Sequence, residues 1–168
     1  MEDLMDEQLY KPGANENQLT VRALAIGCLI GGAVSAMNIY LGLRTGWGFG
    51  GSIIAAILSY SLFQMLSPKK SFGILETNIA QTAGSAAGSM SSTAGLVSAI
   101  PAMSMLGYKL ELWELYLWTL SIAYLGVFFA VPLRKQMVVA EKLRFPTGTA
   151  TAETIVAIFA KGEEAMRK

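Results

Sequence analysis

The sequence has no histidine and a single cysteine among its 168 residues. Histidine is the commonest metal ligand and the side chain that most readily exchanges protons near neutral pH, so both roles must fall to other residues. Cys28 alone cannot build a disulfide framework or a thiolate metal cluster within the chain. The sequence therefore predicts neither a metal site nor a bound cofactor, and any proton chemistry is expected at carboxylates.

Charged residues are also scarce, at 15% of the chain against 53% hydrophobic residues. Soluble domains carry about a quarter charged residues. The charges lie in blocks, at residues 1–22, 67–72, 134–144 and 161–168, and long apolar stretches separate them. This pattern, with a mean hydropathy of +0.45, predicts an integral membrane protein. A net charge of +1 without a dense basic patch gives no indication of nucleic-acid binding.

Several signatures of enzymes and targeting segments are missing. The chain has no HExxH, GxSxG or Walker motif, so neither a membrane enzyme nor an ATP-driven pump is expected. The acidic start, Met1 to Glu7, differs from a secretory signal, which begins with basic residues followed at once by an apolar segment. Residues 1–19 are therefore predicted to form a solvated cytoplasmic tail.

The apolar stretches determine the predicted fold. A helix needs roughly 20 apolar residues to cross a hydrocarbon core of about 30 Å. The sequence predicts an all-α, polytopic bundle of transmembrane helices, followed by a charged end at 161–168. The expected helices lie at about 23–43, 47–66, 73–100 and 112–133, with a partial or re-entrant segment at 147–160.

Basic residues predict the orientation of the bundle. If the amino terminus and the loops after the second and fourth helices share one side, that side holds Lys11, Arg22, Lys69, Lys70, Arg134, Lys135, Lys142 and Arg144. The membrane side richer in lysine and arginine is the cytoplasmic one. We therefore expect the amino terminus to lie inside the cell, and the expected location is the plasma membrane.

The stretch 73–100 is unusually polar for a membrane helix. At about 100° per residue, its hydroxyl and amide side chains form one row, and small residues with Glu76 form the opposite face. Lipid satisfies no polar group, so the row must face other helices or water. It either lines a substrate path or joins neighbouring helices through hydrogen bonds. The row consists of Asn78, Gln81, Thr82, Ser85, Ser89 and Ser92.

The length of this stretch predicts a tilt or a break. An ideal helix of this length spans about 42 Å, which exceeds the thickness of the hydrocarbon core. Glycines mark three places for a break, at Gly84, Gly88 and Gly95. Transporters often break helices near the membrane midplane, where their binding sites lie.

Two carboxylates are the candidates for coupling to protons or cations. A carboxylate inside a membrane is costly and is by default a functional hypothesis. Glu76 lies in the first turn of the third helix, where it also complements the helix dipole. Glu153 follows a stretch of small and polar residues. Glu111 and Glu114 lie among aromatic residues typical of the membrane interface and are expected to be solvated.

Two shorter motifs have both structural and functional interpretations. Gly27 and Gly31 form a GxxxG spacing, which either lets two helices approach closely or occurs by chance in an apolar helix. In the second motif, Pro146 favours a helix start, and Thr147 or Thr149 is expected to cap the helix. If this start lies at membrane depth, Gly148 and Thr149 present free N–H groups to an anionic substrate group. The alternative is a plain cytoplasmic loop.

Three segments, in order, resemble the oligopeptide transporter (OPT) family, including its yellow-stripe-like branch. Asn38–Trp47 resembles the first hairpin of the family, and Glu76–Thr82 resembles its ENxxxQT-like segment, although Thr77 separates the glutamate from the asparagine. Residues 132–137 and 143–152 resemble the PLRKxM and LxYPSGTATA region, with Phe145 in place of the tyrosine and Thr147 in place of the serine.

The resemblance implies part of a secondary active, proton-coupled transporter of small oligopeptides or metal-chelate complexes. Family members are longer, so the chain is expected to be an amino-terminal fragment of a larger transporter fold. Its implied partners are the lipid bilayer, a small peptide or metal-chelate substrate, protons, and the remaining helices or a partner subunit. The alternative is a truncated or split membrane subunit that works only by assembly and does not transport alone.

Overall fold

The structure, a computed structural model, describes residues 10–13, 16–66 and 72–166, with side chains as far as residue 160. Most of the predicted tail, Lys69, Lys70 and the side chains of the charged end 161–168 lie outside the described residues. All regular secondary structure in the described residues is helical, which confirms the all-α fold class. The elements are α1 (Val21–Thr45), α2 (Ser52–Leu66), α3 (Ile74–Thr93), α4 (Ala99–Met105), α5 (Leu112–Leu133), the π-helical segment η1 (Arg134–Ala140) and α6 (Pro146–Met166).

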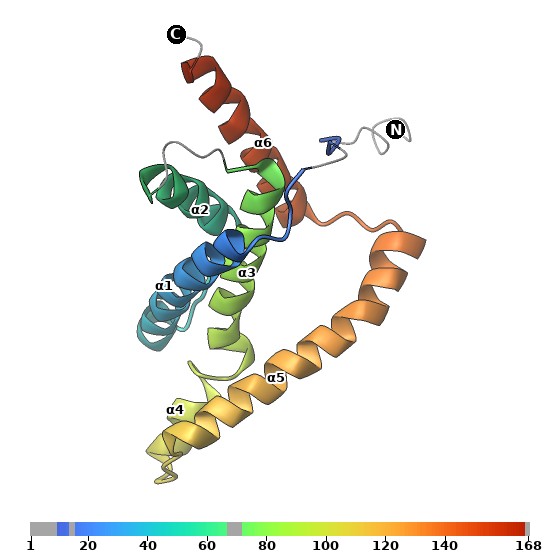
Figure 1. Cartoon of the computed structure of the whole chain (residues 1–168). Coiled ribbons are helices and arrows are strands. Elements are labelled where there is room, and N and C mark those ends of the chain that lie inside the picture. The colour runs from blue at the N-terminus through green and yellow to red at the C-terminus, as the bar shows by residue number, and fades with distance from the viewer. Residues whose placement is uncertain (1–9, 14–15, 67–71, 167–168) are drawn as a thin grey trace.

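Helices α1, α2 and α3 form the packed part of the molecule, with α3 between the other elements (Figure 1). Helix α6 crosses the beginning of α3 and packs on α2, where Phe159 meets Tyr60 edge to face. Helix α5 runs away from this group. Its contact with the end of α3 includes a hydrogen bond of 2.9 Å from Trp118 Nε1 to the carbonyl oxygen of Ala94.

The closest packing in the molecule joins α1 to α3. A Cβ atom added to Gly27 would lie 2.7 Å from the carbonyl oxygen of Ala80, and one added to Gly31 would lie 2.6 Å from Cβ of Ala87. Only glycine permits the two backbones to come this close. Of the two interpretations of the GxxxG spacing, the structure therefore shows the close helix contact and not a chance spacing.

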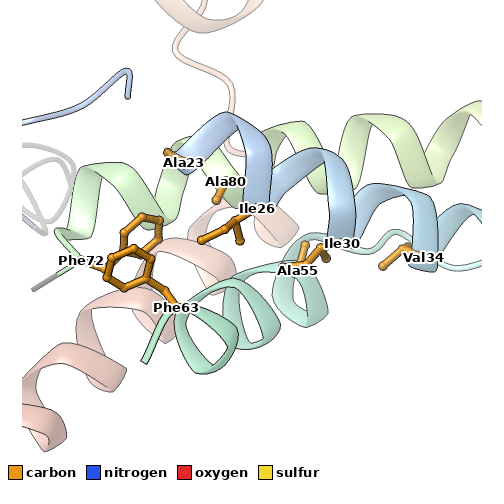
Figure 2. Packing of buried hydrophobic residues seen from close by; sticks show 8 residues of the cluster. All are labelled: Ala23, Ile26, Ile30, Val34, Ala55, Phe63, Phe72 and Ala80. Atoms are coloured by element: carbon orange, nitrogen blue, oxygen red, sulfur yellow. The ribbon is translucent and has the colours of Figure 1, made fainter. Parts of the chain in front are cut away.

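A small apolar core lies under this contact (Figure 2). Ile26, Ile30 and Val34 of α1 are buried against Ala55 of α2 and the small residues of α3. At one end of the core the rings of Phe63 and Phe72 stack with their centroids 4.3 Å apart. The starts of α1 and α3 therefore share one end of the bundle with the end of α2.

The stretch 73–100 is not one continuous helix. Helix α3 ends at Thr93, and α4 begins at Ala99 after a turn in which Gly95 has a φ of +72°. This left-handed conformation is accessible to glycine without steric cost, so it breaks the helix there. The other two predicted break positions, Gly84 and Gly88, lie inside α3 and are buried by packing.

Helix α5 has the predicted bounds, but more of the chain after it is helical than the apolar pattern indicates. Beyond Leu133 the chain stays helical as η1, where the loop after the fourth helix is predicted. Pro132 lies inside α5 and gives no N–H to the preceding turn, a feature associated with irregular helix geometry. Helix α6 begins at Pro146 and continues to Met166, beyond the predicted end at residue 160.

Two helical stretches among the described residues are long and apolar enough to cross a membrane, Val21–Thr45 and Leu112–Ala140. Helix α2 is apolar, but its 15 residues make it shorter than these two stretches. Helix α3 is longer than α2 but rich in polar residues. Membrane crossing by α2, α3 and α6 stays a prediction.

Alanine substitutions at two neighbouring glycines of α1 test its packing on α3. Gly31→Ala is expected to lower the free energy of unfolding by about 1–3 kcal/mol, because its Cβ overlaps that of Ala87. Gly32→Ala is the control, because an added Cβ there meets no atom within 4 Å. Unfolding in detergent micelles measures both variants. Equal stability of the two variants would contradict the close contact.

Candidate functional site

The two predicted faces of α3 have different surroundings. The small face packs on α1, and Ala80, Gly84 and Ser91 are buried there. The polar row lies on the other side: Asn78, Thr82 and Ser89 are exposed, and Gln81 and Ser85 are half-buried. Since the row is not used to bind α1, it remains available to a substrate or to further helices.

Part of the polar row lines an open groove of about 290 Å³ between α3 and the start of α2. Gln81, Thr82, Ser85 and Ser89 are brought together there, next to Ala86. The groove also contains Ser52, whose hydroxyl oxygen lies 3.0 Å from that of Ser85. Sequence reasoning missed Ser52. The signal was weak, because one serine after Gly50 and Gly51 resembles an ordinary helix start.

Most hydrogen-bond donors in the groove are already used within the protein. The side-chain amide of Gln81 donates to Asn78 Oδ1 at 3.1 Å and to Thr82 Oγ1 at 3.0 Å. The hydroxyl groups of Thr82 and Ser89 donate to backbone carbonyl oxygens one turn earlier in α3. The groove therefore presents mainly acceptor oxygens.

A buried asparagine fixes the segment that leads into the groove. Asn38 Nδ2 donates to the carbonyl oxygens of Phe49, at 3.0 Å, and of Gly88, at 3.1 Å. Asn38 Oδ1 accepts from the backbone N–H of Phe49 at 3.2 Å. One side chain of α1 therefore holds both polar groups of Phe49 and ties them to α3. Asn38 belongs to the segment that resembles the family, but the motif alone does not indicate that its side chain binds the backbone of Phe49.

Asn78 lines a second pocket, of about 270 Å³, at the start of α3. The other walls come from α6, with Ala152, Ile155 and Val156, and from the amino-terminal segment, with Tyr10 and Pro12. The Tyr10 hydroxyl donates to Glu16 Oε1 at 2.5 Å, and this bond raises the pKa of Tyr10. Gln81, which lines the groove, donates a hydrogen bond to Asn78, which lines this pocket.

Glu76 lies in an ion-pair network at the shared end of α1, α2 and α3, where it is 1% exposed. It forms an ion pair with Arg22, whose Nε donates to Glu76 Oε1 at 2.7 Å. Thr20 Oγ1 donates to the same oxygen at 2.6 Å, and the N–H of Gly73 donates to Oε2 at 3.2 Å. The Arg22 guanidinium also lies over the rings of Phe63 and Phe72. These bonds give Glu76 a structural role, and its predicted role in coupling stays a prediction.

The remaining predicted residues lie on α6. Glu153 is exposed, and the described residues give its side chain no ion pair or hydrogen bond. Gly148 and Thr149 are exposed in the first turn. The prediction that Thr147 or Thr149 caps the helix is wrong: Pro146 is the first helical residue, and Thr149 donates its N–H and its hydroxyl to the carbonyl oxygen of Phe145. Proline suits this position because its missing N–H has no partner in the first turn.

A larger pocket, of about 420 Å³, lies between α4 and α5. Its walls are apolar apart from Glu114, whose carboxylate accepts from the N–H of Glu111 at 2.9 Å. Ligand sites combine apolar walls with several convergent polar groups. The carboxylate of Glu114 is one polar group, and it is already hydrogen-bonded. The groove on α3 is therefore the better candidate for a ligand site.

The family model described as "OPT oligopeptide transporter protein" matches residues 18–168. The "Putative oligopeptide transporter YGL114W" of Saccharomyces cerevisiae is 36% identical over 155 residues, which cover 82% of this chain and 21% of that protein. A "Putative oligopeptide transporter" of Haemophilus influenzae is 38% identical over 121 residues, 71% of this chain and 18% of its own length.

The "Probable metal-nicotianamine transporter YSL10" of Oryza sativa subsp. japonica is 30% identical over 172 residues, which cover 86% of this chain and 24% of that protein. The chain thus spans about a fifth to a quarter of the length of these relatives. The names describe transporters rather than enzymes. No solved structure matches the chain.

Alanine substitutions of two glutamates test the structural role of Glu76. Glu76→Ala is expected to lower the free energy of unfolding by about 2–3 kcal/mol, because Arg22, Thr20 and Gly73 lose their shared acceptor. Glu153→Ala, at an exposed position on α6, is expected to change it by less than about 0.5 kcal/mol. Denaturant unfolding in micelles measures both. A Glu76 variant as stable as the Glu153 variant would show that the ion pair contributes little.

Proposed function

The chain belongs to the OPT oligopeptide transporter family, and from this premise we propose that it forms part of a secondary active, proton-coupled transporter of small oligopeptides or metal-chelate complexes. The observation that carries the proposal is the family match over residues 18–168. The polar groove on α3 supports it, because a carrier needs polar groups that its own packing does not consume.

The substrate path follows the polar row of α3. Gln81, Thr82, Ser85 and Ser89 contact the substrate in the groove, and Asn78 extends the path to the pocket beside α6. Hydroxyl and amide groups suit this task because they bind neutral and charged groups of a substrate without placing a fixed charge in the membrane.

The first turn of α6 contributes a second contact. Gly148 and Thr149 lie where a helix start offers N–H groups and the positive end of its dipole. An anionic group of the substrate, such as a carboxylate, binds to this turn. The exposure of both residues supports the proposal, since neither is used for packing within the described residues.

Glu153 is the proposed proton-coupling carboxylate. Glu76 is the less suitable of the two candidates, because Arg22, Thr20 and Gly73 already bind its oxygens. Glu153 lies one turn after Thr149 and, within the described residues, has no such partner. A carboxylate without fixed partners can gain and lose a proton during a transport cycle at lower cost than one in an ion pair.

The chain works as a membrane protein with the remaining helices of the transporter around it. We propose a cytoplasmic amino terminus from the distribution of basic residues, and the plasma membrane as the location. No residue of α5 is buried in the described part of the chain, although the helix is apolar on all sides. This surface supports contacts with lipid and with further helices, supplied by the same protein or, in the alternative proposal, by a separate subunit.

Uptake into proteoliposomes tests the function and its coupling. With the complete transporter, an imposed proton gradient is expected to drive accumulation of a labelled tetrapeptide or iron chelate. Glu153→Gln is expected to remove the dependence on the gradient, because the side chain no longer binds and releases a proton. Glu141→Gln, an exposed control in the segment after η1, is expected to keep it.

Two results would reject parts of this proposal. No uptake by the complete transporter with either substrate would reject the transport function. Gradient-driven uptake by the Glu153→Gln variant would reject Glu153 as the coupling group. Uptake that appears only when a second polypeptide is added would favour the assembly subunit.

Leucine substitutions test the start of α6. Gly148→Leu and Thr149→Leu are expected to reduce uptake at least about tenfold, the effect of losing roughly 1.4 kcal/mol of binding, because a bulky apolar side chain covers the first turn of the helix and keeps an anionic group away from it. The structure accommodates the change, since a Cβ at Gly148 meets only Phe145 Cβ, at 3.7 Å. Ala157→Leu, at an exposed position on the same helix, is the control. Unchanged uptake with normal expression would remove the first turn of α6 from the site.

A further inference from the structure

The groove on α3 has an uneven supply of hydrogen-bond donors and acceptors. Both amide hydrogens of Gln81 and the hydroxyl hydrogens of Thr82 and Ser89 are donated to acceptors on α3 itself. Ser52 and Ser85 differ, because their two hydroxyl groups share one hydrogen bond of 3.0 Å. A hydroxyl group carries one hydrogen, so the pair uses one and keeps the other.

The Ser52–Ser85 pair therefore holds the one side-chain hydrogen, among the described residues that line the groove, that has no acceptor in the protein. We propose that this pair is a binding site for a carbonyl or carboxylate oxygen of the substrate. The surrounding oxygens of Gln81, Thr82 and Ser89 accept from N–H groups of the same molecule. The inference rests on the proposed transport function and adds a residue of α2, Ser52, to the substrate site.

The position of Ser52 is set from α1. Asn38 binds both backbone polar groups of Phe49, three residues before Ser52, and anchors them to the carbonyl oxygen of Gly88. Gly51 then packs against Val34, where a Cβ would lie 2.8 Å from Val34 Cγ1. These contacts leave the half-buried Ser52 little freedom, so its hydroxyl meets that of Ser85 at the edge of the groove. Asn38 is thus a positioning residue for the pair.

A set of serine variants in the complete transporter distinguishes substrate binding by the pair from a purely structural hydrogen bond between α2 and α3. Ser52→Ala or Ser85→Ala alone leaves one hydroxyl with its hydrogen free, so the KM for uptake is expected to rise by less than about threefold. The double variant removes the last donor, and its KM is expected to rise about tenfold with little change in maximal rate. Ser52→Thr retains the hydroxyl and is expected to keep the KM close to that of the wild type.

A purely structural tie between α2 and α3 predicts a different pattern. Either single substitution would break the shared hydrogen bond, so each would have the full effect and the double variant would add nothing. The thermal unfolding midpoint of each variant reports that effect directly. Ser61→Ala, at an exposed position of α2 outside the groove, is the control.

The outcomes distinguish the inference from the function on which it rests. An additional loss of affinity in the double variant, with unfolding midpoints close to that of the wild type, supports the pair as a binding site. If the wild type shows uptake but the single and double variants have equal KM values, the proposal that the pair binds substrate is overturned. The proposed transport function then remains intact. Absence of uptake by the wild type rejects both.

Discussion

The close contact between α1 and α3 is the constraint on which the rest of the structure depends. Gly27 and Gly31 let the backbone of α1 approach the small residues of α3 to a distance at which any added Cβ overlaps a neighbour. Because this contact uses the small face of α3, the polar row of the same helix must point the other way. A helix with two such faces can hold a bundle together on one side and leave hydroxyl and amide groups exposed on the other.

The same contact brings the connection between α1 and α2 into the site. Asn38 lies at the outer part of the interface, where it binds the backbone of Phe49 and of Gly88 at once. A buried amide is stable there because its donor and acceptor groups all find partners. Through this arrangement a packing interaction determines where a hydroxyl of α2 stands in the groove. The geometry of the candidate site therefore depends on the packing of α1 against α3 in this part of the molecule.

The two predicted coupling carboxylates have different environments. Glu76 shares its oxygens among Thr20, Arg22 and Gly73, and so joins the starts of α1 and α3 near the stacked rings of Phe63 and Phe72. Glu153 is exposed on α6. Both residues satisfy the general rule that a carboxylate near a membrane suggests function. Hydrogen bonds from Thr20, Arg22 and Gly73 make Glu76 an anchor, whereas Glu153 has no such partner among the described residues.

The sequence by itself determined the helical class, the membrane character, the two faces of α3 and the family, because these depend on local composition, periodicity and ordered motifs. Helix boundaries were less predictable: Gly95 was one of three possible break positions, and α6 continues past its apolar part. Only the tertiary structure decided that Ser52 joins Ser85, that Asn38 holds Phe49 and that Glu76 is paired with Arg22. Each of these interactions joins residues from different helices or from a helix and a loop, and their pairing depends on how closely glycine and alanine allow the helices to approach.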